Sequence, residues 1–409
     1  MRKHKSNKII GALTFLLLGV GLVVIYAIGS QRANFMNSAY GTDYDSNFFF
    51  VHQIISVVMS VAAFVVAFKL PYEKIKPFVK ILMILSLLAC ALLAGLAMVG
   101  SSLASCQLGA CRWINLGSFS LQPAEFLKLS LILYLADLIA QHKAAGTFET
   151  RDFWIPFIIV IGLSLFFVVI LQKDLGTGAC LIAIVLAMLW MSGVKVRDFV
   201  IVLVAIGACG VASILISPHR LERLMTFSGE GSADSSYHID NAMMAIGTGG
   251  LIGVGVGNSV QATGYLPESI NDSVFAVMGE TFGFVGLIAI LACFTVLLLN
   301  IMKVAEGLPS EDGLIAVGVF AWIAAHVVIN IAAMTGLIPL TGITLPLLSY
   351  GGTSMIFISY GLGLVSQFSC YTGRKSKVSS GVSGSVRSSV RSSGVSGSVQ
   401  AGLTRRRKR

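Results

Sequence analysis

Long apolar segments that are almost free of charge constrain this chain more than any other feature. Ten of them have about the length that an α-helix needs to cross a hydrocarbon core of about 30 Å. They lie near Ile9–Ile28, Phe48–Leu70, Phe78–Val99, Leu121–Ala140, Phe153–Leu171, Leu175–Gly193, Phe199–Ile216, Val274–Ile301, Leu314–Ala333 and Leu347–Phe368. The sequence therefore predicts an all-α fold, a polytopic membrane bundle of ten transmembrane helices.

The composition excludes an ordinary water-soluble domain. Of the 409 residues, 56% are hydrophobic and only 12% are charged, and the mean hydropathy is +0.85. Soluble domains carry about 25% charged residues, so this chain lacks the polar surface that water requires. A membrane β-barrel is disfavoured as well, because its strands would alternate in segments of about ten residues rather than form unbroken apolar blocks.

The distribution of Lys and Arg predicts which ends of the helices face the cytoplasm. Loops that remain in the cytoplasm keep an excess of positive charge. With the N-terminus inside, the cytoplasmic loops hold twelve basic residues and the outer loops hold five, which are Arg32, Arg112, Lys173, Arg220 and Arg223. Both termini are therefore expected in the cytoplasm. The net charge of +10 reports this topology and gives no reason to invoke nucleic acid.

The chain divides into a membrane domain and a tail. Residues 1–373 hold the ten spans, with a large extracytoplasmic loop at about 217–273 between spans 7 and 8. Residues 374–409 are rich in Ser and Gly and end in a run of basic residues. Because this composition cannot bury a core, the segment is expected to be disordered. It is interpreted as a solvated cytoplasmic tail near the anionic inner leaflet rather than as a docking segment.

Two charged residues interrupt the fourth span. Glu125 and Lys128 lie three residues apart, which places both on one helix face. A charge at membrane depth costs at least about 2.5–3.5 kcal/mol, so a residue that persists there should have a partner or a task. Mutual neutralisation would explain the pair, but a buried ion pair is weak evidence of stability. A functional role is therefore favoured over a purely structural one.

Short polar segments at the outer ends of other spans add further candidates. Lys173 and Asp174 form a tight outer turn, in which Asp174 suits a helix N-terminus. Trp113 lies in the amphipathic stretch Arg112–Gly117 and is typical of an interfacial aromatic residue. We place Lys173 and Asp174 in the wall of an outer cavity.

Two of the seven cysteines lie in an outer loop. Cys106 and Cys111 fall between the third and fourth spans, where an oxidising compartment would permit a disulfide. A bridge and two free thiols remain equal alternatives, and a bridge would staple the loop rather than take part in catalysis.

Three acidic residues gather where the large outer loop enters the eighth span. Glu268 and Asp272 lie four apart, and Glu280 follows inside the span. Like-charge crowding and burial both raise carboxyl pKa values toward the range that a general base needs near neutral pH. A favourable helix N-terminus would explain Glu268 and Asp272 but not Glu280. The glycine-rich segment upstream is expected to be re-entrant or interfacial; it is not a nucleotide loop, since no βαβ unit precedes it.

An irregular outer loop, Gly336–Ser354, carries two Pro and four Gly and leads into the tenth span. Its last part offers backbone N–H groups that could bind an anionic ligand. The residues concerned are Ser349, Tyr350, Gly351 and Gly352. A turn that merely closes the loop would have the same sequence, so both interpretations stay open.

These segments occur in the order of a known family. The motifs are CRWINLG before LQPAEFLK, then QKDLGTGA, then GLIGVGVGNSVQ before YLPESINDSVFAVMGE, and finally GLIPLTGITLPLLSYGGTS. On these motifs the chain resembles the SEDS proteins (shape, elongation, division and sporulation), which are polytopic peptidoglycan glycosyltransferases. The residues Gly257, Asn258, Ser259 and Gln261 resemble the division branch of that family more than the elongation branch.

The resemblance implies an activity and the roles of single residues. It implies polymerisation of lipid II at the outer face of the bacterial inner membrane during division, with release of undecaprenyl pyrophosphate. It also implies a cognate class B penicillin-binding transpeptidase and other divisome proteins as partners. Asp272 matches the catalytic aspartate of the family, and Glu125 with Lys128 matches its buried acid–base pair. Other motif positions are matched by Trp113, Asp174, Glu268 and Glu280.

Four departures from the family pattern lie beside these residues. Ile270 stands where the family usually has His, and Lys173 stands where it usually has Pro. Asn271 replaces a usual Thr, and Ser273 replaces a usual Phe. The predicted base, Asp272, therefore lacks the titratable neighbour at position 270. Cations expected to hold the diphosphate of the substrate are Arg112, Lys173, Arg220 and Arg223. A divalent cation such as Mg or Mn, bridged to an acid such as Glu268, is an alternative, and no other cofactor is expected.

Two rival functions use the same bundle. A lipid II flippase would depend on Glu125 and Lys128 but not on Asp272. A non-catalytic scaffold that recruits and activates the transpeptidase would tolerate the loss of either set. The glycosyltransferase is the preferred interpretation, because the outer acids are the feature that the other two functions leave unexplained.

Overall fold

The computed structural model describes residues 7–107, 110–117, 119–215, 221, 233–308 and 310–370. Two of the predicted cationic residues, Arg220 and Arg223, lie outside the described residues. The predicted tail from residue 374 and the part of the predicted outer loop at 217–220 and 222–232 lie outside them as well.

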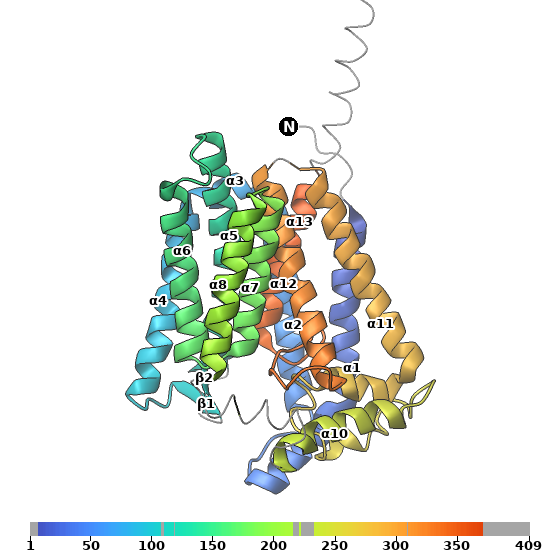
Figure 1. The fold of residues 1–409 in the computed structure, drawn as a ribbon. Coiled ribbons are helices and arrows are strands. Elements are labelled where there is room, and N and C mark those ends of the chain that lie inside the picture. The colour runs from blue at the N-terminus through green and yellow to red at the C-terminus, as the bar shows by residue number, and fades with distance from the viewer. Residues whose placement is uncertain are drawn as a thin grey trace, which may run out of the picture.

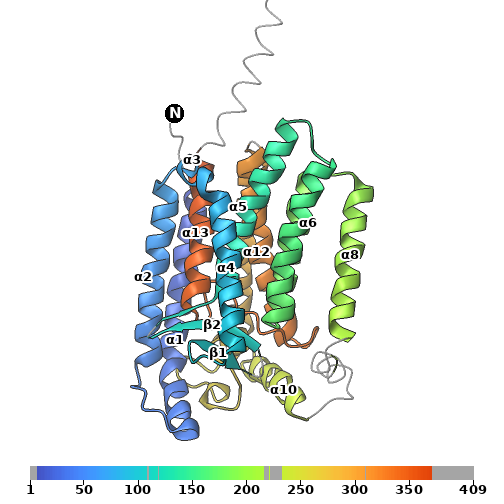
Figure 2. The same cartoon turned by 90° about the vertical axis from the view of Figure 1, so that its left-hand side faces the viewer.

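Long helices standing side by side make up the described fold (Figures 1 and 2). They are α1 (Lys8–Tyr40), α2 (Phe48–Lys69), α4 (Val79–Met98), α5 (Pro123–Ala144), α6 (Arg151–Leu165) with the π-helical continuation η2 (Phe166–Leu171), α7 (Leu175–Met191), α8 (Val196–Leu215), α11 (Val274–Glu306), α12 (Ser310–Met334) and α13 (Gly352–Ser369). Each predicted span overlaps one of these helices. The prediction of a helical membrane protein is thereby confirmed.

Seven helical segments in the described ranges are long and apolar enough to cross a membrane. They are Lys8–Ala39, Phe48–Lys69, Tyr72–Met98, Arg151–Leu171, Val196–Leu215, Val274–Glu306 and Glu311–Met334. Helix α7 is apolar but shorter. The exact number of ten spans therefore stays a prediction.

Smaller elements complete the fold. Helix α3 (Tyr72–Ile75) and the 3-10 turn η1 (Lys76–Phe78) connect α2 to α4, while α10 (Ala233–Thr248) and the 3-10 turn η3 (Gln261–Thr263) precede α11. Three short strands, β1 (Ala104–Gln107), β2 (Ala110–Leu116) and β3 (Phe119–Leu121), form an antiparallel sheet in the order β1-β2-β3.

The sheet corrects the strictly all-α prediction. The amphipathic stretch Arg112–Gly117 is mostly strand β2, in which Ile114 pairs with Ala104 of β1 and with Leu121 of β3. A disulfide joins Cys106 to Cys111, which face each other across the β1–β2 ladder. The bridge closes the hairpin and so favours strand pairing over a helix in this short segment.

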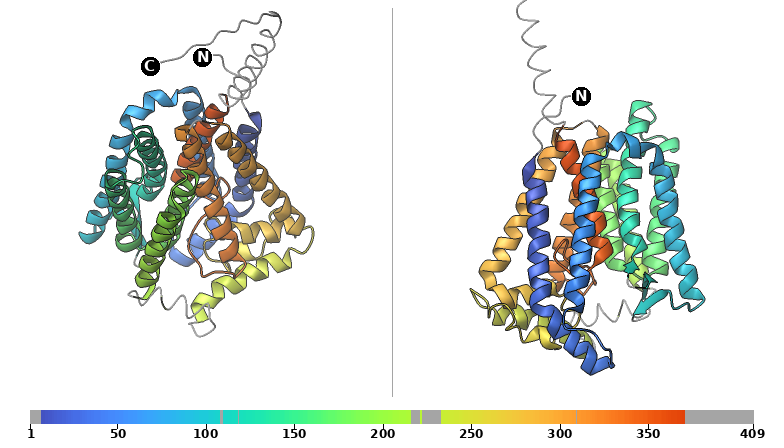
Figure 3. Two further views of the ribbon diagram at one scale, coloured as in Figure 1. Left: turned by 45° about the horizontal axis from the view of Figure 1, so that its top comes forward. Right: turned by 180° about the vertical axis from the view of Figure 1, so that it is seen from behind.

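The two ends of the bundle are built differently. The start of α1 lies beside the end of α13, because the backbone N–H of Asn7 donates to the Ser369 hydroxyl at 2.9 Å. The Asn7 side chain also donates to Asn300 Oδ1 of α11 at 3.0 Å. The sheet, α10 and the loop between α12 and α13 lie at the opposite end (Figures 1 and 3). The irregular backbone of the motifs is thus collected at one end, which we call the sheet end.

Helix α11 is interrupted near the sheet end. Gly283 has φ 67° and ψ −171°, which no helix contains, and Figure 1 shows the two parts of α11 meeting at an angle. The glycine-rich segment fills the break: Val254 N donates to Glu280 O at 2.9 Å, and Gly255 N donates to Thr281 O at 3.1 Å. Backbone groups at membrane depth must be paired within the protein, so this segment and the break stabilise each other.

We predict that Gly253→Ala destabilises the protein. A Cβ at Gly253 would lie 2.3 Å from the Thr281 carbonyl oxygen, and φ is +89° there. Strain of this kind costs about 1–3 kcal/mol before the clash is added. Thermal unfolding in detergent measures the effect. Gly207→Ala in α8, where no atom lies within 4 Å, is the control and should be neutral or slightly stabilising; equal melting temperatures for the two variants would contradict the prediction.

Candidate functional site

The turn that carries Asp272 is held from two sides. Asp272 is 9% exposed, and its backbone oxygen accepts a hydrogen bond of 2.7 Å from Asn330 Nδ2 of α12. The Ile270 oxygen accepts from Tyr350 N at 2.8 Å. The side-chain atom Asp272 Oδ1 is buried without a hydrogen-bond partner among the described residues. The backbone is therefore fixed while one carboxyl oxygen stays available to an incoming donor.

The surroundings of Asp272 bring the pKa of its carboxyl group close to neutral pH. Burial, and after it the nearby Glu268 carboxylate, raise the pKa of Asp272 to about 7, against the opposing effect of the Arg112 guanidinium. A general base works best when its pKa lies near the operating pH. The pKa of Asp272 and its unpartnered Oδ1 atom are those expected of a general base.

Glu268 belongs to the same turn but is itself engaged. It has a positive φ of 48°, and Asn271 Nδ2 donates to its Oε2 atom. Arg32 of α1 lies 3.6 Å from its Oε1 atom. The sequence analysis did not count Arg32 among the cations expected to hold the diphosphate. Helix α1 extends past its predicted span to Tyr40, and this longer part brings Arg32 to the Glu268 turn.

A histidine approaches Asp272 from an element that the sequence did not connect to it. His238 Nε2 of α10 lies 2.7 Å from Ser273 Oγ, and Ser273 Oγ donates to the Pro267 oxygen at 2.9 Å. Because the Ser273 hydroxyl donates its only proton to the Pro267 carbonyl, it accepts from His238, and the imidazole N–H is the donor. Position 270 is Ile rather than His, but the titratable ring of His238 contacts Ser273, the residue that follows Asp272.

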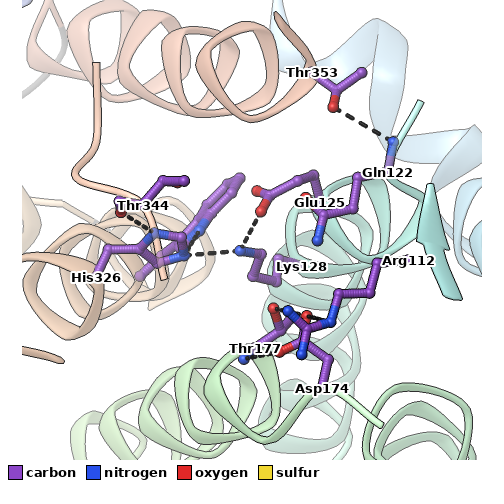
Figure 4. A network of polar contacts seen from close by, with 10 residues as sticks. Arg112, Gln122, Glu125, Lys128, Asp174, Thr177, His326, Thr344 and Thr353 are labelled. Carbon is purple, nitrogen blue, oxygen red and sulfur yellow. Dashed lines mark hydrogen bonds and ion pairs between the residues drawn. The ribbon is translucent and has the colours of Figure 1, made fainter. Parts of the chain in front are cut away.

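A second cluster lies at the start of α7. Asp174 caps this helix as predicted, accepting from Thr177 N at 3.0 Å and from Thr177 Oγ1 at 2.9 Å. Arg112 Nε lies 3.5 Å from Asp174 Oδ2 (Figure 4), and Arg112 Nη2 donates to the Lys173 oxygen at 3.4 Å. The Lys173 side chain itself is exposed. Trp113 is half-buried on β2, opposite Ser105.

The predicted pair in α5 is buried and forms part of a larger network (Figure 4). Lys128 Nζ lies 2.7 Å from Glu125 Oε1 and 2.8 Å from His326 Nε2 of α12. The Trp322 ring lies beneath the ammonium group, 5.2 Å from Nζ to the ring centroid. His326 Nδ1 lies 3.2 Å from the Thr344 oxygen. The pair is therefore tied to the loop before α13 through a histidine that sequence reasoning missed.

Glu280 has a structural task that the sequence did not reveal. It is fully buried, and its carboxylate accepts from the Ser259 hydroxyl, from Val260 N at 2.9 Å and from Gln261 N at 3.3 Å. It thereby fastens the end of the glycine-rich segment to α11. No substrate contact is needed to explain this acid.

The segment from Ser349 to Gly352 is largely engaged in its own loop. Ser349 N donates to the Leu345 oxygen at 3.1 Å, and Leu345 N donates to Ser349 Oγ at 2.9 Å. Tyr350 N is bonded to the Asp272 turn as described above, and Gly352 begins α13. These bonds favour the turn interpretation for Ser349 and Tyr350.

The acids do not assemble into a ready-made metal site. Within the described ranges, no three side chains of His, Cys, Asp or Glu come together as possible ligands. A divalent cation at the Asp272 turn would therefore have to take most of its oxygen ligands from the phosphates of a substrate.

Comparison with known proteins assigns the chain to a group of relatives. The cell cycle protein family named after FtsW, RodA and SpoVE matches residues 8–373. Stage V sporulation protein E of Bacillus subtilis is 34% identical over 378 residues, which cover 91% of this chain and 99% of that protein. A probable peptidoglycan glycosyltransferase FtsW of a Thioalkalivibrio species is 36% identical over 359 residues, which cover 86% of each chain.

Solved structures show the same fold. A chain in a peptidoglycan synthase complex that coordinates polymerization and crosslinking superposes with a TM-score of 0.69 at 22% identity, over 90% of this chain and 99% of that chain. The rod shape determining protein RodA of Thermus thermophilus superposes with a TM-score of 0.61 at 24% identity, over 89% and 96%.

We predict that Lys128→Met is strongly destabilising. The substitution leaves Glu125 buried without its cation, and breaking a buried pair in this way costs about 3–5 kcal/mol. The double variant Glu125→Gln with Lys128→Met should recover most of the loss, because it removes both charges. Thermal unfolding in detergent measures the series.

The matched control for this series is Lys76→Met. Lys76 pairs with Glu311, but its side chain is 43% exposed, so the loss should stay within about 1 kcal/mol. A Lys128→Met protein as stable as Lys76→Met would contradict the burial argument.

Proposed function

This chain belongs to the FtsW/RodA/SpoVE family of cell cycle proteins, and we propose on that premise that it is a peptidoglycan glycosyltransferase. The proposed reaction polymerises lipid II into glycan strands at the outer membrane face during cell division and releases undecaprenyl pyrophosphate. The observation that carries the proposal is the Asp272 carboxyl group, which is buried, held by its backbone and unpartnered at Oδ1.

The proposed step needs one base. Asp272 takes the proton from the 4-hydroxyl of the acceptor sugar while that oxygen attacks the anomeric carbon of the donor chain. The new glycosidic bond forms as the bond from that carbon to the diphosphate breaks, so the anomeric centre is inverted. The diphosphate leaves with the electron pair, and the proton stays on Asp272 until solvent removes it.

The leaving diphosphate needs positive charge near the turn. Arg112 acts electrostatically on Asp272, Lys173 is exposed on the same side of the bundle, and Arg32 reaches Glu268. We propose these three, together with Arg220 and Arg223, as the groups that hold the phosphates. Guanidinium groups suit this task because they bind phosphate oxygens with two parallel hydrogen bonds.

We further propose that the sheet end faces the outside. The Cys106–Cys111 disulfide lies at this end, and disulfides persist in oxidising compartments. The opposite end carries the first residue of α1 and the last of α13, in accord with cytoplasmic termini and ten spans. The expected partners are a class B penicillin-binding transpeptidase and other proteins of the division septum.

The rival functions are separated by one experiment. Glycan polymerisation from purified lipid II is measured with the wild-type protein. The measurement is made once alone and once with a co-purified transpeptidase whose own active site is blocked. Polymer formation supports the enzyme. A flippase would move lipid II across vesicles without making polymer, and a scaffold would do neither while still binding the transpeptidase.

We predict that Asp272→Asn lowers the polymerisation rate by about 10²–10⁴-fold, the usual contribution of a general base. The amide is nearly isosteric but does not accept the proton. The rate is measured from lipid II in detergent at saturating substrate. Asn258→Ala serves as the control, because Asn258 is exposed and its side chain donates to the Val254 oxygen within the same loop. Normal polymerisation by Asp272→Asn would make the assignment of the base wrong.

We predict that kcat/KM rises with pH through the pKa of Asp272, because only the ionised carboxylate accepts a proton. With a pKa of about 7, the rate at pH 6 should be about tenfold below its high-pH plateau. Glu268→Gln should move the midpoint to lower pH, since it removes a negative neighbour. Arg112→Gln should move it to higher pH, since it removes a positive one. Shifts of the same sign in both variants would contradict this electrostatic account.

A further inference from the structure

One face of α12 joins the buried charge pair to the Asp272 turn. His326 and Asn330 lie four residues apart on this helix, so they share a face. Both are about 1% exposed. Apart from Trp322, the neighbouring residues of α12 are apolar, so two buried polar side chains at this spacing require an explanation. The glycosyl transfer proposed above gives them no role.

Asn330 connects two segments that are distant in sequence. Its Nδ2 atom donates two hydrogen bonds, each of 2.7 Å, to the backbone oxygens of Asp272 and Ile343. A side-chain amide has two N–H donors, and both are used here. Because the backbone of Asp272 is one of the acceptors, the amide fixes the point from which the proposed base extends.

His326 makes the corresponding connection to α5. Its Nδ1 atom lies 3.2 Å from the Thr344 oxygen, and since a carbonyl only accepts, Nδ1 carries the proton. Nε2 is then an acceptor, in agreement with the donors Lys128 Nζ at 2.8 Å and Trp322 Nε1 at 3.2 Å. A neutral imidazole therefore links Lys128 to Thr344.

The two connections meet in one dipeptide. Ile343 and Thr344 are consecutive, and α12 holds both of their carbonyl oxygens. The Ile343 carbonyl accepts from the same Asn330 amide as the Asp272 carbonyl. The Thr344 carbonyl accepts from the His326 imidazole, whose other nitrogen accepts from Lys128. The path from the intramembrane ion pair to the turn thus consists of hydrogen bonds, the side chains of His326 and Asn330, and one peptide unit.

We propose that Asn330 and His326 are positioning residues that fix Asp272 relative to the Glu125–Lys128 pair. We call the hydrogen-bonded path from Lys128 through His326, the dipeptide Ile343–Thr344 and Asn330 to the Asp272 backbone the frame. The Glu125–Lys128 pair acts on catalysis by holding this frame in place, without contact with the reacting groups. The inference rests on the proposed role of Asp272 as the base. Misplacing a reacting group by about 1 Å lowers rates by about 10²-fold, so a frame of this kind has a measurable effect.

The first test is Asn330→Ser. A hydroxyl has one proton and a shorter reach, so it does not hold both carbonyls. We expect kcat to fall about 10- to 100-fold with KM for lipid II unchanged, and the pH midpoint to move as the burial of Asp272 changes. Asn300→Ser is the matched control: Asn300 is also a buried amide, but it bonds to Val296 and Asn7 at the opposite end of the bundle.

The second test separates hydrogen bonding from packing at His326. In His326→Gln, the side-chain amide donates to Thr344 and accepts from Lys128, so it should keep most of the activity. His326→Leu should lose activity as Asn330→Ser does. If both residues act through one frame, the variant with His326→Leu and Asn330→Ser should be little worse than the more impaired single variant. Losses that multiply would overturn the coupling.

A third readout does not need activity. Hydrogen–deuterium exchange of the amides in residues 268–273 should quicken in Asn330→Ser and His326→Leu, and it should match the wild type in Asn300→Ser and Asp272→Asn. A wild type that makes no polymer would remove the proposed function, while the exchange would still test the frame. If the wild type polymerises and Asn330→Ser equals it in kcat, pH midpoint and exchange, the inference fails and the function stands.

Discussion

Hydrogen bonding of non-helical backbone is the constraint on which this structure depends. In hydrocarbon no water pairs with an exposed N–H or C=O group, so irregular backbone is tolerated only where protein atoms pair it. At the sheet end a buried side chain does this for each irregular segment: Glu280 for the glycine-rich segment, Asn330 for the Asp272 turn and His326 for the loop at Thr344. Helices α11 and α12 therefore contribute to the site through the polar side chains that they carry inward.

The same constraint distinguishes Asp272 from the other acids around it. Glu125 has Lys128, Asp174 has its helix cap and Arg112, Glu280 has three donors, and Glu268 has Arg32 and Asn271. Asp272 keeps one oxygen free in a buried place, and burial raises its pKa to about 7. The proposed chemistry thus rests on a contrast in ion pairing: Glu125, Asp174 and Glu268 each have a cation within 4 Å, and among the described residues Asp272 has none. A list of acidic residues does not contain this contrast.

Local features of the sequence were sufficient for the helices and for the cap at Asp174, because span length and the capping bond involve residues close in the chain. The sheet was missed, since pairing of Ala104 with Ile114 depends on a hairpin closed by the disulfide. The types and spacing of His326 and Asn330 were visible, but their partners lie 18 and 58 residues away. His238 and Ser273, which are in contact, are 35 residues apart in sequence, and both belong to the predicted outer loop at 217–273. Such contacts follow from packing, which no local pattern encodes.

The hairpin that carries Arg112 also has a consequence for how the protein matures. Thiols in the cytosol are kept reduced, so the bond between Cys106 and Cys111 forms only where the environment is oxidising. With the sheet end outside, this loop meets an oxidant only after α4 has entered the membrane and the chain has crossed it. Arg112 reaches Asp174 of a helix that is synthesised later. On the proposed orientation, assembly of the site therefore includes a covalent step after insertion, and it depends on the thiol-oxidising capacity of the cell as well as on folding.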